Sequence, residues 1–521
     1  MPLSSRLLRP AAALCAAAVL PLAAACGDDD GNAGADPAAL APARAPMYVE
    51  VNLNPGDDVK ELARKLSGEE DPGGAIKRLI EKEARKSDKD FKYSEKVEPW
   101  LGDRAGLFVS GFSAGGDSPP AAVVVATKDV DKARETLEEQ IRKGESGGPK
   151  PQVVERTHKG TKYLVDTSDD EAVAFVEDYA VFGNDAAVKL AIETPDGESL
   201  AENGEYEKAR EAVEEDGVGF AYIRFSQIFS ALGPQGEAAK QLLSGYGETF
   251  AVGLDGDPDS IDLESAALGV SEDNPYAGPG EVVASLPASS WGAYGTADFG
   301  KQIQRYIEKF GEAAASGLGQ SPEQLFGQLE RELGFDVRRE LEWIDDIGVF
   351  VLGDKLTELG GGLVAKTSDP AATRRSIPRL VTFLEGAADV QGEPLRRAGV
   401  VEGTTLRSTE IPVPIHLALT EDDRFIIVAS DGALAQTLQA TDKLGDSQPW
   451  KDAAGRLGDG IQPSFFVNFE PIPALIEAAG VDEDDPTYQQ FKKALQQLTT
   501  LAGGGKREGD VQRGRLVVGV R

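Results

Sequence analysis

Few residues of this chain could carry chemistry, and the most informative of them is a cysteine close to the N-terminus. Cys26 follows the apolar stretch Ala11–Leu22 and a short run of alanines. Arg6 and Arg9 precede that stretch, so the segment has the positive start, apolar middle and small residues of an export signal. The apolar stretch is too short to cross a bilayer as a helix. We predict that it directs export and is then removed.

Cleavage is expected between Ala25 and Cys26, which makes residues 1–25 a lipoprotein-type signal peptide. Leu22 and the alanines before the cysteine resemble the lipidation motif of bacterial lipoproteins, although Leu22 stands one residue further from the cysteine than is usual. Cys15 leaves with the signal, so Cys26 would be the single thiol of the mature protein and could form no intramolecular disulfide. We predict a diacylglyceryl group on Cys26, whose two chains suffice for stable anchoring. Secretion without lipidation is the alternative.

Two serine motifs match the nucleophile pattern G-x-S-x-G but lack its structural setting. Ser113 follows a predicted strand, yet a loop of Gly, Asp, Ser and Pro follows it where the nucleophile elbow needs a helix. Ser146 follows a predicted helix and precedes Pro149. We interpret the first as a hairpin loop and the second as a helix-ending loop, and we predict no catalytic residue.

The chain is equally poor in metal-binding patterns. Its two histidines, His158 and His416, have no metal-type partner at helical spacing. Asp255–Ser260 begins like a calcium loop but lacks the glycine at its sixth position, and Ala266 replaces the closing glutamate. Weak calcium binding there stays open. We otherwise predict no metal site and no cofactor.

The charge of the chain narrows its partners. The formal net charge is −34, and such a surface repels phosphate backbones, so we predict no nucleic-acid partner. No apolar run after the signal is long enough to span a membrane. We interpret the acidic surface as a means of staying soluble in an anionic cell envelope.

An internal repeat organises the rest of the chain. Short matches recur in the same order at a nearly constant spacing, which indicates that one fold has been duplicated. The matched pairs are Pro42 with Pro287, Tyr48 with Tyr294, Trp100 with Trp343, Gly106–Val109 with Gly348–Val351, Asp129 with Asp369, Asn184 with Ser430, and Leu268–Val270 with Val518–Val520.

The repeat sets the predicted domains. Residues 26–40 are rich in Gly, Ala and Asp and are expected to form a disordered acidic tether. Two α+β domains follow, 41–270 and 284–521, each with a mainly antiparallel sheet and packed helices. The turn-rich residues 271–283 are expected to link them.

Local signals place several elements within each half. Asp129 and Asp369 should each cap a helix, as should Asn184 and Ser430. Strands are predicted at 107–110, 121–126, 162–165, 173–177, 179–182 and 219–225, and a hairpin should pair 250–254 with 261–268.

The chain resembles a known bacterial family. Tyr48–Glu50, the block Pro99–Gly106 and the two-half layout behind a lipoprotein-like signal are similar to the family called domain of unknown function 3352. The resemblance covers nearly the whole mature chain, and Trp100–Asp103 is its most specific part. It implies an exported envelope protein and transfers no catalytic residue. Because Trp100 and Trp343 immediately precede predicted buried strands, we interpret them as structural anchors.

These observations predict an exported cell-envelope protein, held on the extracytoplasmic face of the membrane by the lipid on Cys26. It should act as a non-enzymatic binding or interaction module whose partner is an envelope protein or an apolar ligand. Two alternatives stay open. One is a carrier that holds an apolar ligand, such as a lipid, within or between its halves. The other is a hydrolase whose site is not visible in the sequence.

Overall fold

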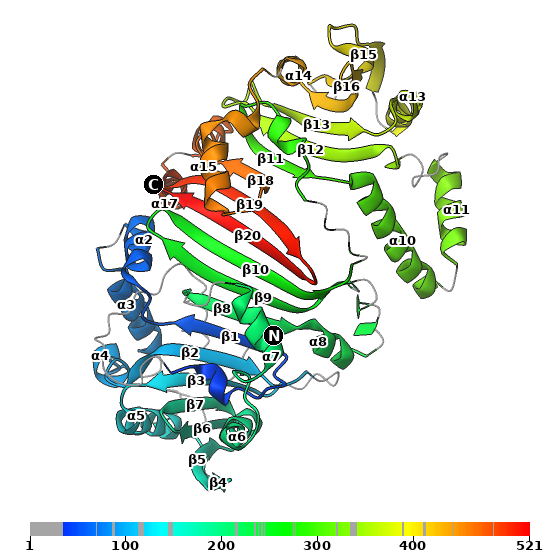
Figure 1. Cartoon of the computed structure of the whole chain (residues 1–521). Helices are drawn as coiled ribbons and strands as arrows, with labels where there is room; N and C mark the ends of the chain where they lie inside the picture. The colour runs from blue at the N-terminus through cyan, green and yellow to red at the C-terminus, as the bar shows by residue number, and fades with distance from the viewer. Residues whose placement is uncertain are drawn as a thin grey trace. The chain divides into compact units, whose positions relative to one another are not determined.

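The fold was analysed on a computed structural model, shown in Figure 1. It describes residues 35–521 except 69, 86–88, 113–118, 144–149, 214–216, 234–235, 238, 241–242, 244, 273, 275, 277, 319–320, 334–340, 388–389, 410–412, 440 and 483. The chain divides into two compact units. The first runs to Ser271 and includes Gly509–Arg513, and the second comprises Glu272–Glu508 and Gly514–Arg521.

The sheet of the first unit has ten strands in the order β4-β5-β6-β7-β3-β2-β1-β8-β9-β10, and every neighbouring pair is antiparallel. Its strands are β1 (Met47–Asn52), β2 (Leu101–Val109), β3 (Ala121–Thr127), β4 (Val153–His158), β5 (Thr161–Asp166), β6 (Glu171–Val176), β7 (Tyr179–Asn184), β8 (Gly219–Arg224), β9 (Tyr246–Asp257) and β10 (Ser260–Val270). Its helices are η2 (Pro37–Leu40), α2 (Asp57–Ser67), α3 (Pro72–Ala84), α4 (Tyr93–Lys96), α5 (Val130–Lys143), α6 (Asp185–Glu193), η3 (Thr194–Asp196), α7 (Gly204–Glu211) and α8 (Phe225–Ala231).

The sheet of the second unit has the order β14-β15-β16-β17-β13-β12-β11-β18-β19-β20, with antiparallel pairs from β14 to β19. Its strands are β11 (Ser290–Thr296), β12 (Ile344–Leu352), β13 (Gly360–Thr367), β14 (Val390–Pro394), β15 (Val400–Ser408), β16 (Ile415–Thr420), β17 (Arg424–Ala429), β18 (Pro463–Asn468), β19 (Leu498–Glu508) and β20 (Val511–Val520). Its helices are η4 (Val283–Ser285), α10 (Phe299–Leu318), α11 (Pro322–Leu333), α13 (Pro370–Ala387), α14 (Asp431–Leu438), η5 (Leu444–Asp446), α15 (Gln448–Arg456), α16 (Ile472–Ala478) and α17 (Pro486–Gln497).

The predicted α+β class with antiparallel sheets is confirmed by these helices and strands. The two units share one strand order when the strands of each are counted in sequence. Duplication of one fold is the interpretation that we attach to that shared order.

One match of the predicted repeat is wrong by a residue. Tyr48 pairs with Phe108, whereas Phe350, which corresponds to Phe108, pairs with Ala293. Ala293 therefore corresponds to Tyr48, and Tyr294 lies on the opposite face of its sheet. A slip of one residue has this effect because side chains alternate between the two faces of a strand.

The predicted helix caps are confirmed in both units. Asn184 Oδ1 accepts a hydrogen bond from the Ala187 amide at 2.9 Å, and Ser430 Oγ accepts one from the Ala433 amide at 3.1 Å. Asp129 Oδ1 likewise accepts from the Lys132 amide, and Asp369 Oδ1 accepts from two amides of α13. The predicted hairpin is also present as β9 and β10, although both strands are longer than expected.

Each sheet carries an apolar cluster on both of its faces. In the first unit, one cluster lies around Tyr48 and Phe108, and the other lies around Trp100, beneath α5. In the second unit, the corresponding clusters lie around Phe350 and Trp343. Both tryptophans are buried, as expected of anchors, with 4% and 7% of their surface exposed.

The chain enters the first unit earlier than the sequence indicates. Ala38 and Leu40, in η2, are completely buried, and the Leu200 amide donates to the carbonyl of Ala41 at 2.7 Å. The tether predicted to reach residue 40 is therefore wrong for residues 35–40, which we call the N-terminal strap. The strap is held by the chain just after Ser199, because the Ala201 amide donates a hydrogen bond to the Ala38 carbonyl at 3.3 Å.

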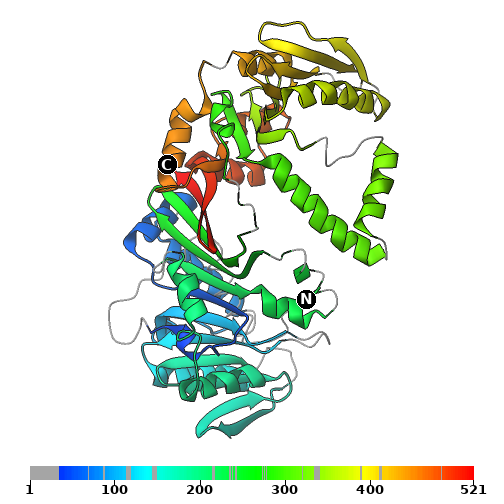
Figure 2. The same ribbon diagram turned by 45° about the vertical axis from the view of Figure 1, so that its right-hand side comes forward.

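The helical hairpin of α10 and α11 is the longest helical part of the second unit (Figures 1 and 2). The helices cross where Gly311 faces the ring of Phe326, which a side chain at Gly311 would strike. Among the described residues, no helix is long and apolar enough to cross a membrane.

Candidate functional site

A partly uncovered apolar surface lies on one side of the second unit's sheet. Tyr294 of β11 pairs with Val349 of β12 and with Phe465 of β18, and Val349 pairs with Leu363 of β13. Residues paired across antiparallel strands project from the same face. The next row on that face joins Val467, Gly292, Val351 and Gly361. We call these eight positions the apolar face, and none of them carries a charge.

The apolar face is open at three of its eight positions, whereas Leu363 at its edge packs against the cluster around Trp343. Tyr294, Val349 and Val351 are 47%, 38% and 37% exposed, whereas Phe350 on the other side is 1% exposed. Antiparallel sheets with one solvated face usually place polar residues on it. Exposed apolar patches of this kind mark surfaces that bind another molecule.

The corresponding face of the first unit is more covered. Val109, which corresponds to Val351, is 9% exposed, and Leu107, which corresponds to Val349, is partly buried against the cluster around Trp100. The openness in the second unit is therefore not required by the shared strand order.

The sequence contains a signal for this surface, which is an uninterrupted apolar run rather than an alternation of apolar and polar residues. Residues 347–352 of β12 are apolar or glycine at every position. Such a run is typical of a strand that is apolar on both faces. The repeat match at Gly348–Val351 predicts a strand but does not indicate that this strand is apolar on both of its faces.

A second candidate is a buried cluster of polar residues in the first unit. Tyr48 Oη donates to Glu50 Oε2 at 2.8 Å, and Arg210 Nη2 donates to Glu50 Oε1 at 3.0 Å. Arg210 Nη1 also donates to Tyr206 Oη at 3.1 Å, and Arg104 Nη1 lies 3.6 Å from Glu50 Oε1. The carboxylate therefore faces two guanidinium groups and one phenol.

Burial and charge together set the proton states in this cluster. Burial raises the pKa of the Tyr48 and Tyr206 phenols, and the nearby Glu50 carboxylate raises them further. Burial by itself would lower the pKa of Arg210, but Glu50 and Tyr206 outweigh it and the pKa is raised. The cluster therefore holds a charged arginine and neutral phenols, which is an arrangement for holding structure together.

The second unit builds the same fold without this cluster. Ala293 stands at the position of Tyr48, and Gly295 stands at that of Glu50. Counting from the caps of α7 and α15, Trp450 replaces Tyr206 and Ala454 replaces Arg210. The polar cluster is thus a special feature of the first unit.

The two histidines have different surroundings. His158 Nε2 lies 2.6 Å from Glu193 Oε1 near the surface. His416 is 2% exposed, with Nδ1 3.0 Å from Thr405 Oγ1. Its Nε2 lies 3.2 Å from Asp431 Oδ1, a distance that would allow a hydrogen bond, but the two groups are not aligned for one. Burial lowers the pKa of His416, and the Asp431 carboxylate only partly opposes that effect.

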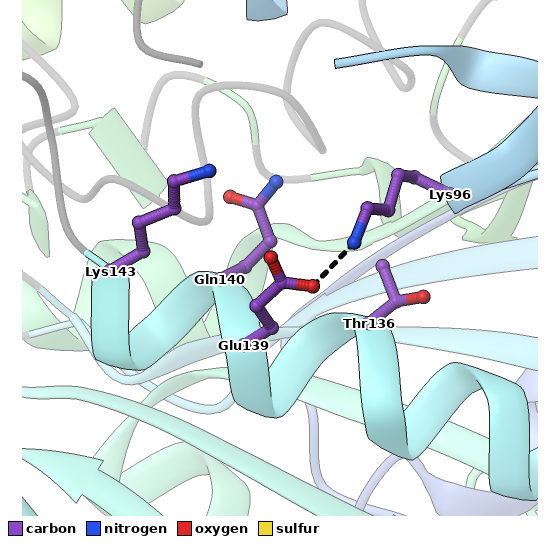
Figure 3. A pocket seen from close by; sticks show the side chains of 5 residues that line it. All are labelled: Lys96, Thr136, Glu139, Gln140 and Lys143. Carbon is purple, nitrogen blue, oxygen red and sulfur yellow. Dashed lines mark hydrogen bonds and ion pairs between the residues drawn. The ribbon is translucent and has the colours of Figure 1, made fainter. Parts of the chain in front are cut away.

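A shallow depression lies on the outer face of α5 (Figure 3). Its empty volume is about 180 Å³, and it is lined by Lys96, Thr136, Glu139, Gln140 and Lys143. Lys96 closes one side by an ion pair with Glu139. These are surface side chains around a space open to solvent, so we assign no ligand to it.

The two predicted site residues lie outside the described part of the chain, namely the cleavage site at Ala25 and the lipidation site at Cys26. Ser113 and Ser146, for which we predict no catalytic role, lie outside it as well. Within the described residues, no group of three or more His, Cys, Asp or Glu side chains could hold a metal ion.

Comparisons with known proteins place the chain in a family without assigning it an activity. No curated protein matches it. Two crystal forms of the protein TP0453, III and I, are similar over 47% of this chain, at 10% and 9% identity, covering 84% and 83% of TP0453. Their TM-scores of 0.25 and 0.24 are too low to support any inference. The family model described as "Protein of unknown function (DUF3352)" matches residues 11–518, so the chain belongs to the DUF3352 family.

Proposed function

We propose that the protein is a lipid-anchored, exported binding module of the cell envelope that acts without catalysis. The apolar face of the second unit carries the binding part of this proposal, and the motif before Cys26 carries the anchoring part. The described polar clusters support the same reading, since Glu50 and Arg210 neutralise each other inside the first unit.

The short segment between Cys26 and the N-terminal strap is consistent with a lipid anchor at Cys26. Residues 26–34 would separate the acylated cysteine from the N-terminal strap, and a chain of that length spans at most roughly 30 Å. The strap itself is buried, so a pull on the lipid would act on the fold directly. Mass spectrometry of the mature N-terminal peptide tests this step. A diacylglyceryl adduct on Cys26 is expected, and an unmodified thiol would leave a secreted protein.

The apolar face favours a partner that offers a neutral, apolar surface. A photo-crosslinking residue at Val351 should trap such a partner in intact cells. The control places the same residue at Val154 of β4, which is similarly exposed at 41% but lies outside the apolar face. Equal labelling from the two positions would contradict a binding role for the face.

A carrier of an apolar ligand is the second candidate, and the same surface favours it. Lipid extracted from the purified protein and identified by mass spectrometry would support the carrier. Val349→Asp should then lower the amount of bound lipid, whereas Tyr306→Ser on α10, where the side chain is 61% exposed, should not. Protein adducts without bound lipid would instead favour the interaction module.

A further inference from the structure

The peptide bond between Asp36 and Pro37 lies where the proposed tether meets the folded protein, and two hydrogen-bond donors hold its carbonyl. The Asp36 carbonyl oxygen accepts a hydrogen bond from the Ala39 amide at 3.1 Å and another from Tyr179 Oη at 2.9 Å. Two donors on one carbonyl polarise it and would stabilise an oxyanion formed there.

The side chain of Asp36 is placed next to that carbonyl in a partly buried, acidic setting. Its Oδ1 accepts from the Ala38 amide at 2.9 Å. Burial, and then the negative charge of Glu50, raise the pKa of the Asp36 carboxyl. The hydrogen bond from the Ala38 amide, followed by Arg210 and Arg104, only partly opposes them. The neutral acid is therefore favoured more than in an ordinary aspartate.

The Tyr179 phenol keeps its proton and can therefore donate a hydrogen bond to the Asp36 carbonyl during the whole reaction. Burial, followed by the nearby carboxylates including Asp36, raises its pKa to about 12. The phenol thus keeps its proton at every pH at which the fold would work.

We propose that the Asp36–Pro37 bond is a self-cleavage site. The Asp36 carboxyl oxygen attacks its own carbonyl carbon, and its proton passes to the nitrogen of Pro37. The bond between that carbon and the nitrogen breaks, which leaves a cyclic anhydride on Asp36 and a free amine on Pro37. One water molecule then opens the anhydride and restores two carboxyl groups. Tyr179 and the Ala39 amide stabilise the oxyanion in the first step.

The consequence rests on the proposed lipid anchor. Cleavage would leave residues 26–36 with the lipid and release a chain that starts at Pro37. Pro37, Ala38 and Leu40 are buried, so the released protein would keep the rest of the strap, residues 37–40, in place. The cleavage step does not depend on lipidation, so it can be tested separately.

The chain provides its own controls, because four other Asp–Pro bonds share the same chemistry. They follow Asp71, Asp257, Asp369 and Asp485, all of which are exposed. The closest match is Asp369, whose carbonyl also accepts from an amide and a hydroxyl of Thr373. Its carboxylate, however, is exposed and accepts two amide hydrogen bonds at the start of α13, whereas the Asp36 carboxyl is partly buried and accepts one.

The test incubates the folded mature chain carrying Cys26→Ala, so that lipidation plays no part, at about pH 5 and at about pH 8. Intact-mass spectrometry then follows the fragments. Cleavage after Asp36 should be at least about tenfold faster than at the other four bonds, and faster at the lower pH. In denaturant the five bonds should become comparable, because the folded surroundings are lost.

Three variants separate chemistry from folding. Asp36→Asn keeps a cap acceptor for Ala38 but removes the acid, and should abolish the preferential cleavage. Pro37→Ala should slow it by giving a poorer leaving amine. Tyr179→Phe should slow it about tenfold or more while the melting curve stays cooperative. Cleavage at Asp36 that is no faster than at Asp369, or that is unchanged in Asp36→Asn, would overturn the proposal. Neither result would bear on whether Cys26 is acylated in the native protein.

Discussion

At the scale of single residues, the first unit concentrates its buried charge around one carboxylate. The side chains of Glu50 and Arg210 are 6% and 15% exposed, so water hydrates neither charge well. Each charge is instead compensated by the other. The second unit forms the corresponding strand around Gly295 and the corresponding helix around Ala454. Removing one partner of the pair should therefore destabilise the protein strongly, whereas replacing both partners together should destabilise it much less.

Glu50→Ala tests the first half of that statement. It should lower the free energy of unfolding by about 3–5 kcal/mol, because the buried Arg210 loses the carboxylate with which it forms an ion pair. Arg210→Ala should cost a similar amount. The double variant should cost clearly less than the sum, as urea unfolding of all three proteins would measure. Additive losses would mean that the two side chains do not stabilise each other.

His416 should make the stability of the second unit depend on pH. Its pKa in the fold is below the usual 6.5, so the unfolded chain binds more protons in mildly acidic solution. The stabilising contribution is present above pH 6.5 and is lost as the pH falls towards the folded pKa. The slope for this one proton cannot exceed about 1.4 kcal/mol per pH unit.

Comparison with His416→Asn isolates this effect from the rest of the protein. The free energy of unfolding of the natural chain, minus that of the variant, should fall between pH 7 and pH 5. Asp431, Arg397 and Arg407 are the charged groups around the ring, and all three stay in place in the variant. If the difference is constant over this range, the pKa of His416 is the same in the folded and the unfolded chain.

At the scale of secondary-structure elements, the sequence predicted what local chemistry determines. Caps such as Asn184 and Asp369 satisfy amides a few residues away, so a short stretch of sequence is enough to identify them. The prediction that Tyr294 corresponds to Tyr48 is wrong by one residue because both faces of that sheet carry apolar side chains. The alternation of apolar and polar residues then cannot show which face a residue lies on. The Glu50 cluster joins residues 160 positions apart, and among many acidic residues nothing local singles out that carboxylate.

The equivalent caps of α6 and α14 allow a matched pair of variants. Asn184→Ala and Ser430→Ala should each lower the free energy of unfolding by about 1 kcal/mol, since each leaves a helix amide without its acceptor. Ser430 has a φ of 84°, a region that favours glycine. Ser430→Gly should therefore cost less than Ser430→Ala, whereas Asn184→Gly gains no such relief. Urea unfolding measures all four, and equal losses for Gly and Ala at position 430 would contradict backbone strain there.

At the scale of the whole molecule, the two units share one strand order but have cores made of different residues. Tyr206 and Trp450 occupy the same place in α7 and α15, yet one contacts an arginine and the other packs against Phe466. Sheet order depends on the pattern of apolar residues more than on their identity. The same strand order can therefore hold different cores, and the exposed apolar positions of the second unit do not depend on it.

Ending the chain at Gly514 tests whether the last strand belongs to the fold of the second unit. The truncation removes Val517 and Val520, which are 2% and 3% exposed, and most of β20 with them. Their burial alone is worth at least about 3 kcal/mol, so amides of the second unit should lose protection in hydrogen exchange. Gly509–Arg513, which belong to the first unit, are retained, so β1 to β8 should stay protected. Removing only the exposed Arg521 is the control. Unchanged protection of β11 and β18 in the truncated chain would show that β20 adds nothing to the stability of its unit.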